Sequence, residues 1–174
     1  NLIRVSDFKD YQEARQEFAV FSGSLVSLQG KSLKLQAGDG RTLWQREVSL
    51  KQPFITALSE IIVAADVEEN IIYGISSKGE DLWEAKSAGN IIRMGVDKEH
   101  IWMRTQHEEL AIVEILDQNG KEAAYLQVEG AEVTGVSVSR DGSLIAVSTA
   151  GVKEGGITGS VMLYKKDGAI AWAK

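Results

Sequence analysis

A short turn motif recurs through the chain and constrains its fold more than any other feature. In each copy a turn-forming residue and a glycine are followed by two variable residues, an apolar residue and an aromatic one. Three copies carry tryptophan at the aromatic position and one carries Ala124 there: Asp39–Trp44, Lys78–Trp83, Asn119–Tyr125 and Asp167–Trp172. The glycines are 39, 41 and 48 residues apart. The chain therefore consists of four units of similar length.

Each motif has the chemistry of a hairpin turn, because Asp-Gly and Asn-Gly supply the positive φ angles that tight antiparallel turns require. Strand-like runs flank every turn, and two more precede each such pair. Many of these runs are almost continuously apolar, as expected for strands covered on both faces. In chain order the runs are 18–21, 25–28, 33–37, 43–48, 55–58, 61–65, 71–76, 82–85, 91–96, 100–104, 111–116, 123–128, 133–138, 144–148, 161–164 and 170 onward.

Four strands in about 40 residues, repeated four times, are typical of β-propeller blades, which pack face to face around an axis. We therefore predict an all-β fold of four-stranded antiparallel blades, with repeats at 22–53, 54–90, 91–132 and 133–174. Residues 1–21 form an N-terminal connector that contains the first strand. A short helix capped by Ser6 and Asp7 is expected from Asp7 to Glu17. It packs on the propeller, leads to a membrane anchor or binds a partner.

The cycle of strand, Asp/Asn-Gly, two variable residues and Leu-Trp resembles the repeat of PQQ-type (quinoprotein-like) β-propellers. Residues 22–174 carry the resemblance, most clearly in 33–48, 71–86 and 161–172. The copy with Ala124 departs from the pattern. The resemblance implies the fold but no single activity, because the relatives include quinone-dependent dehydrogenases, outer-membrane assembly lipoproteins and surface proteins without known catalysis. We expect the motif tryptophans to wedge between neighbouring blades and Trp102, which is out of phase, to lie in the core.

The resemblance implies six to eight blades in a closed ring, whereas this chain supplies four. Three arrangements fit: the chain is half of a longer propeller, two copies close an eight-bladed ring, or four blades close alone. Both ends look cut, since the chain begins at Asn1 and stops at Lys174 within an expected strand. An open half-propeller would expose two apolar faces. We therefore favour a longer ring or closure by a homodimer.

Composition excludes several classes of function. With 44% hydrophobic and 25% charged residues the chain is globular, and no apolar run approaches the roughly 20 residues that span a bilayer. A net charge of -6, with scattered lysines and arginines, argues against nucleic acid as a partner. The absence of cysteine removes disulfides, thiolate metal sites and a cysteine nucleophile.

The candidate chemical motifs are better explained as structure. Gly30-Lys31-Ser32 lacks the upstream glycine of a phosphate-binding loop, and Ser24 lacks the second glycine of a nucleophile elbow. His100 and His107, even with Glu108 and Glu109, do not supply a convergent ligand set. The acidic run 66–70 is interpreted as an exposed hairpin turn. We therefore nominate no catalytic, cofactor-binding or metal-binding residue and expect no cofactor.

The segment Ala150–Ser160 is the longest insertion in the repeats, and we interpret it as a loop or a long hairpin. Together these features predict a non-catalytic propeller that serves as a scaffold or binding module for a protein partner or another ligand. The expected location is a bacterial envelope or secreted protein, extracytoplasmic or membrane-anchored. Two alternatives stay open at this stage: a piece of a quinoprotein-like enzyme with catalytic residues outside this chain, and an extracytoplasmic sensor domain.

Overall fold

The computed structural model describes residues 16–108, 110–128, 132–153 and 155–174. These residues form sixteen strands and no helix. In chain order the strands are β1 (Gln16–Phe21), β2 (Ser24–Gln29), β3 (Ser32–Gln36), β4 (Thr42–Glu47), β5 (Pro53–Ala57), β6 (Ile62–Asp66), β7 (Ile71–Ile75), β8 (Asp81–Lys86), β9 (Asn90–Asp97), β10 (His100–His107), β11 (Leu110–Asp117), β12 (Glu122–Val128), β13 (Glu132–Val138), β14 (Leu144–Lys153), β15 (Gly156–Lys165) and β16 (Ile170–Ala173).

Each group of four consecutive strands forms one antiparallel sheet, and all four sheets are simple meanders. The predicted four blades are therefore confirmed. Of the helix expected from Asp7 to Glu17, residues 7–15 lie outside the described residues, and Gln16 and Glu17 belong to β1.

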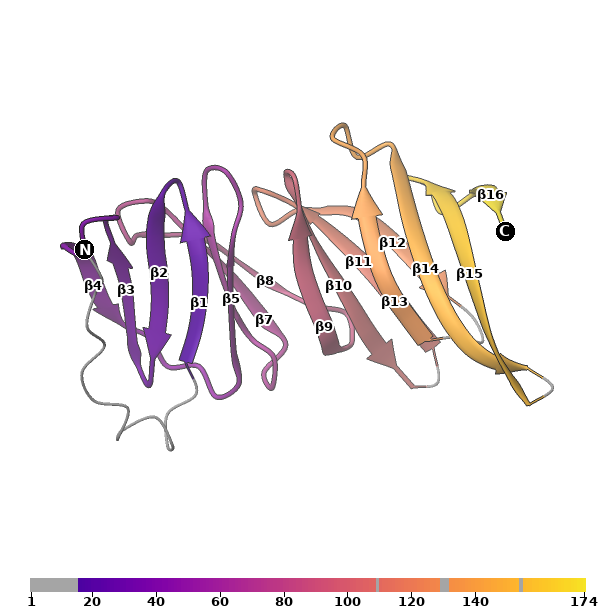
Figure 1. Ribbon diagram of the computed structural model, residues 1–174, viewed down its shortest axis with the longest axis horizontal. Helices are drawn as coiled ribbons and strands as arrows, with labels where there is room; N and C mark the ends of the chain where they lie inside the picture. Colours follow the sequence, from indigo (N-terminus) through magenta and orange to yellow (C-terminus); the bar gives the residue numbers. More distant parts are fainter. Residues whose placement is uncertain (1–15, 109, 129–131, 154) are drawn as a thin grey trace.

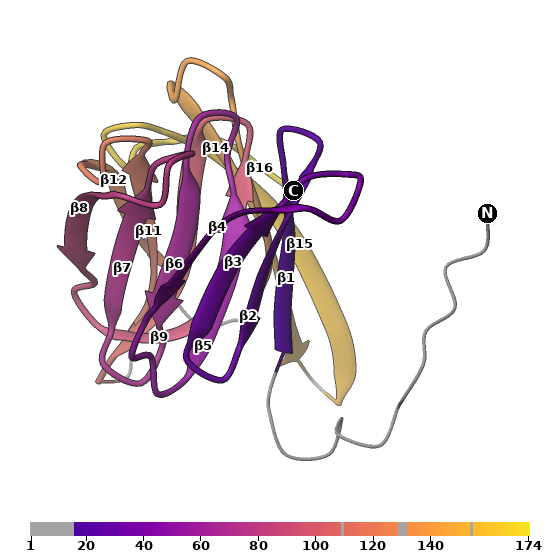
Figure 2. The same cartoon turned by 90° about the vertical axis from the view of Figure 1, so that its left-hand side faces the viewer.

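The four sheets stand face to face in a row, with the first and the fourth at opposite ends (Figure 1). Figure 2 views the row from the end of the first sheet, with the other sheets behind it. β5 contacts β1 on one side and β9 on the other, and β13 contacts β10. The blades of this chain thus form an open arc, and a four-bladed closed ring is excluded for this structure.

Three apolar cores fill the three junctions between successive sheets. Fully buried side chains of these cores include Val26, Leu28, Leu33 and Ile62 at the first junction, Val63, Ile72, Ile101 and Met103 at the second, and Val113, Ile115, Ile145 and Val147 at the third. Because each core draws on two sheets, no single sheet is stable without a neighbour.

Burial along the strands separates the inner sheets from the outer ones. All five residues of β6 are buried, and in β10 the first six are buried. In the end sheets the strands alternate instead, so that β2 buries only Val26 and Leu28. A sheet covered on one face alternates in this way, whereas a sheet covered on both faces is apolar throughout. The first and fourth sheets therefore each have one uncovered face.

The four motif turns share one geometry. Each turn glycine has a positive φ between 73° and 86° and donates its N–H to the carbonyl oxygen three residues earlier. In every sheet the pairing of the third and fourth strands shifts register five residues before that glycine, between Leu35 and Gln36 in the first sheet. Glycine in this conformation followed by a bulge fixes how the fourth strand leaves the turn.

Candidate functional site

A tryptophan of the fourth strand ties each of the first two sheets to the sheet that follows. Trp44 on β4 donates its indole N–H to the carbonyl oxygen of Ser77 at 2.8 Å. Trp83 on β8 donates in the same way to Gln118 at 2.9 Å. Both acceptors stand two residues before a turn glycine of the next sheet. The indole thus fills the junction with apolar surface and satisfies its one polar atom on the neighbouring turn.

The turn glycine is required by this contact as well as by its backbone angle. A Cβ at Gly79 would lie 2.9 Å from the ring of Trp44, and one at Gly120 would lie 2.5 Å from the ring of Trp83. No real side chain fits at these distances. We call the acceptor carbonyl together with the surface over the turn glycine the turn site. The wedge role predicted for the motif tryptophans is confirmed for Trp44 and Trp83.

The two ends of the row carry unmatched halves of the same contact. Trp172 lies on the uncovered face of the fourth sheet, 50% exposed, opposite Leu163, and its indole N–H has no partner among the described residues. In the first sheet the turn site comprises the carbonyl of Gly38 and the surface over Gly40. A Cβ at Gly40 would meet nothing within 4 Å, so no described tryptophan occupies this site. Among the described residues no further sheet faces Trp172, so the wedge prediction is not met at this position.

The third junction is built differently. Ala124 occupies the tryptophan position, opposite Ile115 on β11. A tryptophan appears two strands further in, where Trp102 on β10 is 9% exposed and packs over Gly95. The prediction that Trp102 is a core residue is confirmed. At this junction the large aromatic side chain thus lies nearer the inner strands, and the outer part of the junction lacks an indole.

A carboxylate joins the third and fourth sheets near their inner strands. Asp97, the last residue of β9, accepts hydrogen bonds from the hydroxyl of Ser137 at 2.6 Å and the N–H of Val138 at 2.8 Å. Burial alone would raise the pKa of the Asp97 carboxyl, but these two hydrogen bonds lower it below its ordinary value. Hydrogen bonds to a charged carboxylate therefore connect the inner strands of the two sheets at this junction.

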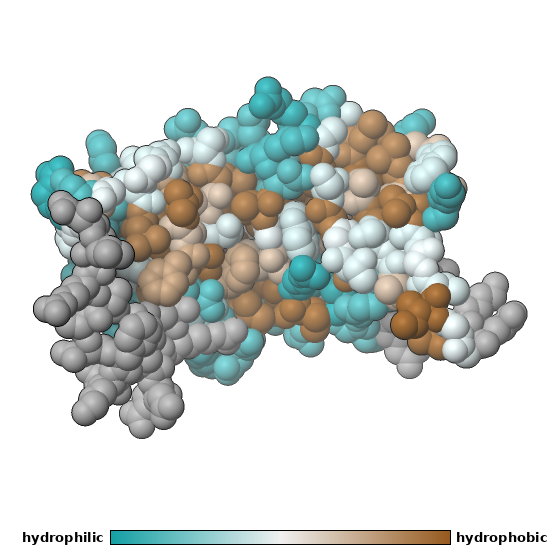
Figure 3. All heavy atoms as spheres, viewed as in Figure 1, coloured by the Kyte–Doolittle hydropathy of each residue, from teal (hydrophilic) through white to brown (hydrophobic). Residues whose placement is uncertain are grey.

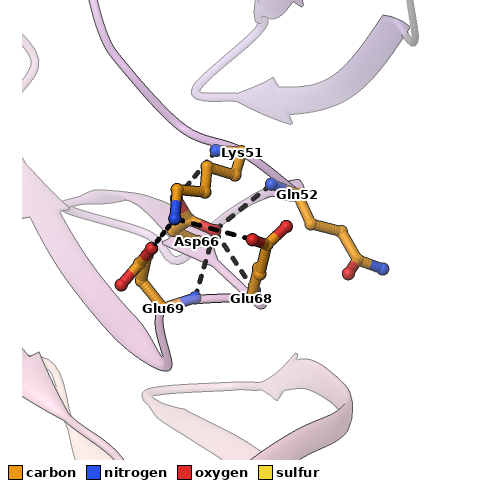
Figure 4. A network of polar contacts seen from close by, with 5 residues as sticks. All are labelled: Lys51, Gln52, Asp66, Glu68 and Glu69. Atoms are coloured by element: carbon orange, nitrogen blue, oxygen red, sulfur yellow. Dashed lines mark hydrogen bonds and ion pairs between the residues drawn. The ribbon is translucent and has the colours of Figure 1, made fainter.

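Asp66 is the centre of a polar network between the first two sheets (Figure 4). Its carboxylate, on a residue 3% exposed, accepts backbone N–H bonds from Lys51 at 2.7 Å, from Gln52 and Glu68 at 3.2 Å, and from Glu69 at 3.4 Å. Above it, the Lys51 ammonium pairs with Glu68 and Glu69. The exposed turn predicted at 66–70 is right for the two glutamates and wrong for Asp66.

In this network the Asp66 carboxylate oxygens accept hydrogen bonds from the backbone, so little acceptor capacity is left for a ligand. Burial would raise the pKa of the Asp66 carboxyl, but the four N–H donors outweigh it and lower the pKa. Because these donors belong to the segment before β5 and to the β6–β7 turn, the carboxylate fixes the path of the chain from the first sheet into the second.

The histidines do not meet. His100 and His107 are the first and last residues of β10, so they lie about 23 Å apart along the strand. His100 is buried and His107 is exposed; Glu109, considered beside them, lies outside the described residues. Among the residues that the structure describes, no group of three or more histidine or acidic side chains could hold a metal ion.

The remaining sequence candidates fall on hairpins. Gly30 and Lys31 form the β2–β3 turn and Ser24 begins β2, which confirms the interpretation of Gly30-Lys31-Ser32 as a turn. The insertion 150–160 is a hairpin whose strands β14 and β15 pair as far as Lys153 and Gly156. On this hairpin the paired side chains of Val152 and Ile157 are 79% and 89% exposed, a feature that the sequence pattern alone did not single out.

Comparison with protein families gives one assignment. Residues 3–169 match the family of unknown function DUF5711. The chain belongs to this family. A search of curated proteins found no match. Within the part of the chain that the structure describes, no helix could cross a bilayer.

Solved structures with a similar fold are β-propellers. They include BamB from Moraxella catarrhalis (11% identity, TM-score 0.53, 90% of this chain and 60% of that one) and the Pan2 WD40 domain of Neurospora crassa (17%, 0.58, 90% and 50%). A third is the complex of KlAtg21 with the coiled coil of AgAtg16 (14%, 0.64, 91% and 55%). At these identities the likeness shows the propeller fold alone. The chain spans 50–60% of the length of these three structures.

The tryptophan contact predicts unequal effects of alanine at two turn glycines with similar φ. Gly23 has φ +76° and open space around its Cβ position, whereas Gly120 has φ +73° and the Trp83 ring against it. We expect Gly23→Ala to lower the free energy of unfolding by about 1–2 kcal/mol through backbone strain alone. Gly120→Ala should lower it by about 2–5 kcal/mol, because the ring must also move. Urea denaturation followed by circular dichroism measures both, and equal losses would contradict the contact.

The Asp66 network predicts a stability loss that fades in acid. Asp66→Asn should lower the free energy of unfolding by about 1–3 kcal/mol at pH 7, because charged hydrogen bonds become neutral ones. Since the folded pKa lies below the ordinary value, the advantage of the wild type exists above pH ~4 and disappears as pH falls through the folded pKa. Urea midpoints at several pH values test this, with Glu99→Gln, at an exposed glutamate outside the network, as the control.

Proposed function

We propose that this chain is a non-catalytic β-propeller scaffold whose end blades associate with each other and whose turns and central opening bind proteins, and that its repeat is of the PQQ type. One observation carries the proposal: the two ends of the row are complementary. The fourth sheet presents Trp172 without a turn site, and the first sheet presents a turn site, at Gly38 and Gly40, without a tryptophan. Two internal junctions of the same chain show how such halves fit together.

Exposed apolar side chains accompany both halves. On the uncovered face of the first sheet, Phe18 and Val20 are 54% and 75% exposed, and Leu25 lies beside Val20 on β2. On the fourth sheet Val161 and Trp172 are also exposed. Figure 3 shows brown apolar side chains over both the first and the fourth sheets. Burying such surface against a matching blade is favourable by about 25 cal/mol per Å².

The occupant we propose for each end face is a second copy of this chain. The fourth sheet of one copy would dock on the first sheet of the other, with Trp172 donating to the carbonyl of Gly38. Two such head-to-tail contacts related by a two-fold axis close a ring of eight blades. The ring would present its turns and its central opening to protein partners. The exposed hairpin side chains Val152 and Ile157 are suited to contribute specificity.

Solution mass tests the closure. Light scattering behind a sizing column should give twice the 19.0 kDa of one chain at roughly 50 μM, and the dimer should persist on about tenfold dilution. A monomer throughout would sink the proposal. Larger assemblies would support the head-to-tail contact but contradict the closed ring.

Matched variants decide whether the proposed contact makes the dimer. Trp172→Ala removes the donor, and Gly40→Ala places a Cβ where the internal turn sites leave 2.5–2.9 Å to an indole ring. Each should weaken dimerisation at least tenfold. Gly30→Ala imposes backbone strain on the β2–β3 turn, where φ is +58° and the Cβ position is open, and Leu43→Ala removes an exposed side chain of β4. Both controls should keep the mass of the wild type.

We also propose that the protein works outside the cytoplasm, in a bacterial envelope or as a secreted protein. The resemblance of its turns to the PQQ-type repeat supports this location. Fractionation of the native cells, with detection by antibody, should find the protein in the envelope or medium. Recovery in the cytoplasmic fraction, beside a cytoplasmic marker enzyme, would overturn the location without affecting the scaffold.

A further inference from the structure

The junction between the third and fourth sheets contains a groove where its sister junctions contain an indole. The groove has a volume of about 870 Å³ and is lined by Ala124 and Tyr125 of β12, Leu144 of β14 and the turn residues Lys165 and Lys166. Ala124 pairs with Ile115 in the register that sets Trp44 opposite Leu35 and Trp83 opposite Gly74. The groove therefore lies beside the position at which a tryptophan is missing.

The turn site that would receive this tryptophan is present. By position in the repeat, the carbonyl of Lys166 corresponds to those of Ser77 and Gln118, and no described indole donates to it. A Cβ at Gly168 would find only a methyl group of Leu126, at 3.9 Å. The glycine has φ +84°, so the turn keeps the shape of its sisters. The acceptor carbonyl and the open space over Gly168 are therefore present although this chain places no indole there.

The chain has no spare tryptophan to fill the groove from within this junction. Trp102 is buried over Gly95 and takes a cation–π contact from Arg93, whose guanidinium lies 5.9 Å from the ring centroid. Asp97 holds the inner strands of the two sheets together, so the groove does not close by collapse of one sheet on the other.

We propose that this groove binds a tryptophan side chain of a partner protein, presented on an extended segment. The ring would cover Gly168 beside Ala124 and donate its N–H to the carbonyl of Lys166. At the sister junctions the indole arrives on a β-strand that runs beside the turn, and a groove of this volume has room for residues on either side of the ring. This geometry favours a peptide segment over a free indole compound.

Titration of isotope-labelled protein with short peptides tests the proposal. A capped Gly-Gly-Trp-Gly-Gly peptide should shift the backbone amide resonances of Ala124, Lys166 and Gly168, and the same peptide with alanine at its centre should not. N-acetyl-tryptophanamide should bind at least fivefold more weakly than the tryptophan peptide. Equal shifts from both peptides, or shifts confined to other residues, would overturn the site. If N-acetyl-tryptophanamide bound as tightly as the tryptophan peptide, the proposal that the ligand is a peptide segment would be wrong.

Two variants locate the binding. Leu144→Glu places a carboxylate at the groove and should weaken the tryptophan peptide at least tenfold, whereas Leu43→Glu, at an exposed leucine of the first sheet, should have no effect. Ala124→Trp restores the repeat and should abolish peptide binding by filling the groove with its own ring. If Ala124→Trp does not fold, the comparison of Leu144→Glu with Leu43→Glu still decides.

The inference stands independently of the proposed dimer. Gly40→Ala, designed to prevent association of the end faces, should bind the tryptophan peptide as the wild type does. If the variant no longer dimerises but still binds the peptide, the result supports the groove as a separate binding site. A dimer that binds no peptide would overturn the groove alone.

Discussion

The packing of this protein depends on a contact between an indole and the turn of the next sheet. The contact joins two requirements at one place, because the indole N–H needs an acceptor and the ring needs a neighbour without a Cβ. A turn glycine with a positive φ meets the second requirement, and a carbonyl two residues earlier meets the first. At the first two junctions the contact sets successive sheets in one orientation and closes the apolar core at its outer side.

A contact of this kind has a direction, and the direction gives the two ends of the row different chemistry. Every sheet offers an indole position on one face and a turn site on the other, so an open row ends in one unsatisfied half of each kind. The buried carboxylates work differently. Asp66 and Asp97 use their hydrogen bonds to hold connections and inner strands, which do not depend on a further sheet.

The third junction shows that the fold is kept when the aromatic ring that fills a junction comes from a different strand. Trp102 supplies an aromatic ring near the inner strands, and the outer part has a groove beside the buried Ala124 instead of an indole. The turn after β15 nevertheless keeps its glycine and its free carbonyl. A repeat protein can vary one position in this way without loss of its fold, because each junction is closed by its own set of contacts. The groove beside Ala124, where the repeat departs from its pattern, is therefore the position at which a partner's side chain fits best.

The sequence alone determined the number of blades, the approximate strands and the turn glycines, because these follow from local turn chemistry and from the period of the apolar pattern. It also identified Ala124 as the exception among the motif tryptophans. Only the tertiary structure decided that Asp66 is buried, that segment 150–160 continues two strands, and that Trp172 is exposed whereas Trp44 and Trp83 are not. These outcomes depend on which sheet stands opposite each face. Residues with the same local sequence differ in burial when one has a neighbouring sheet and another has none.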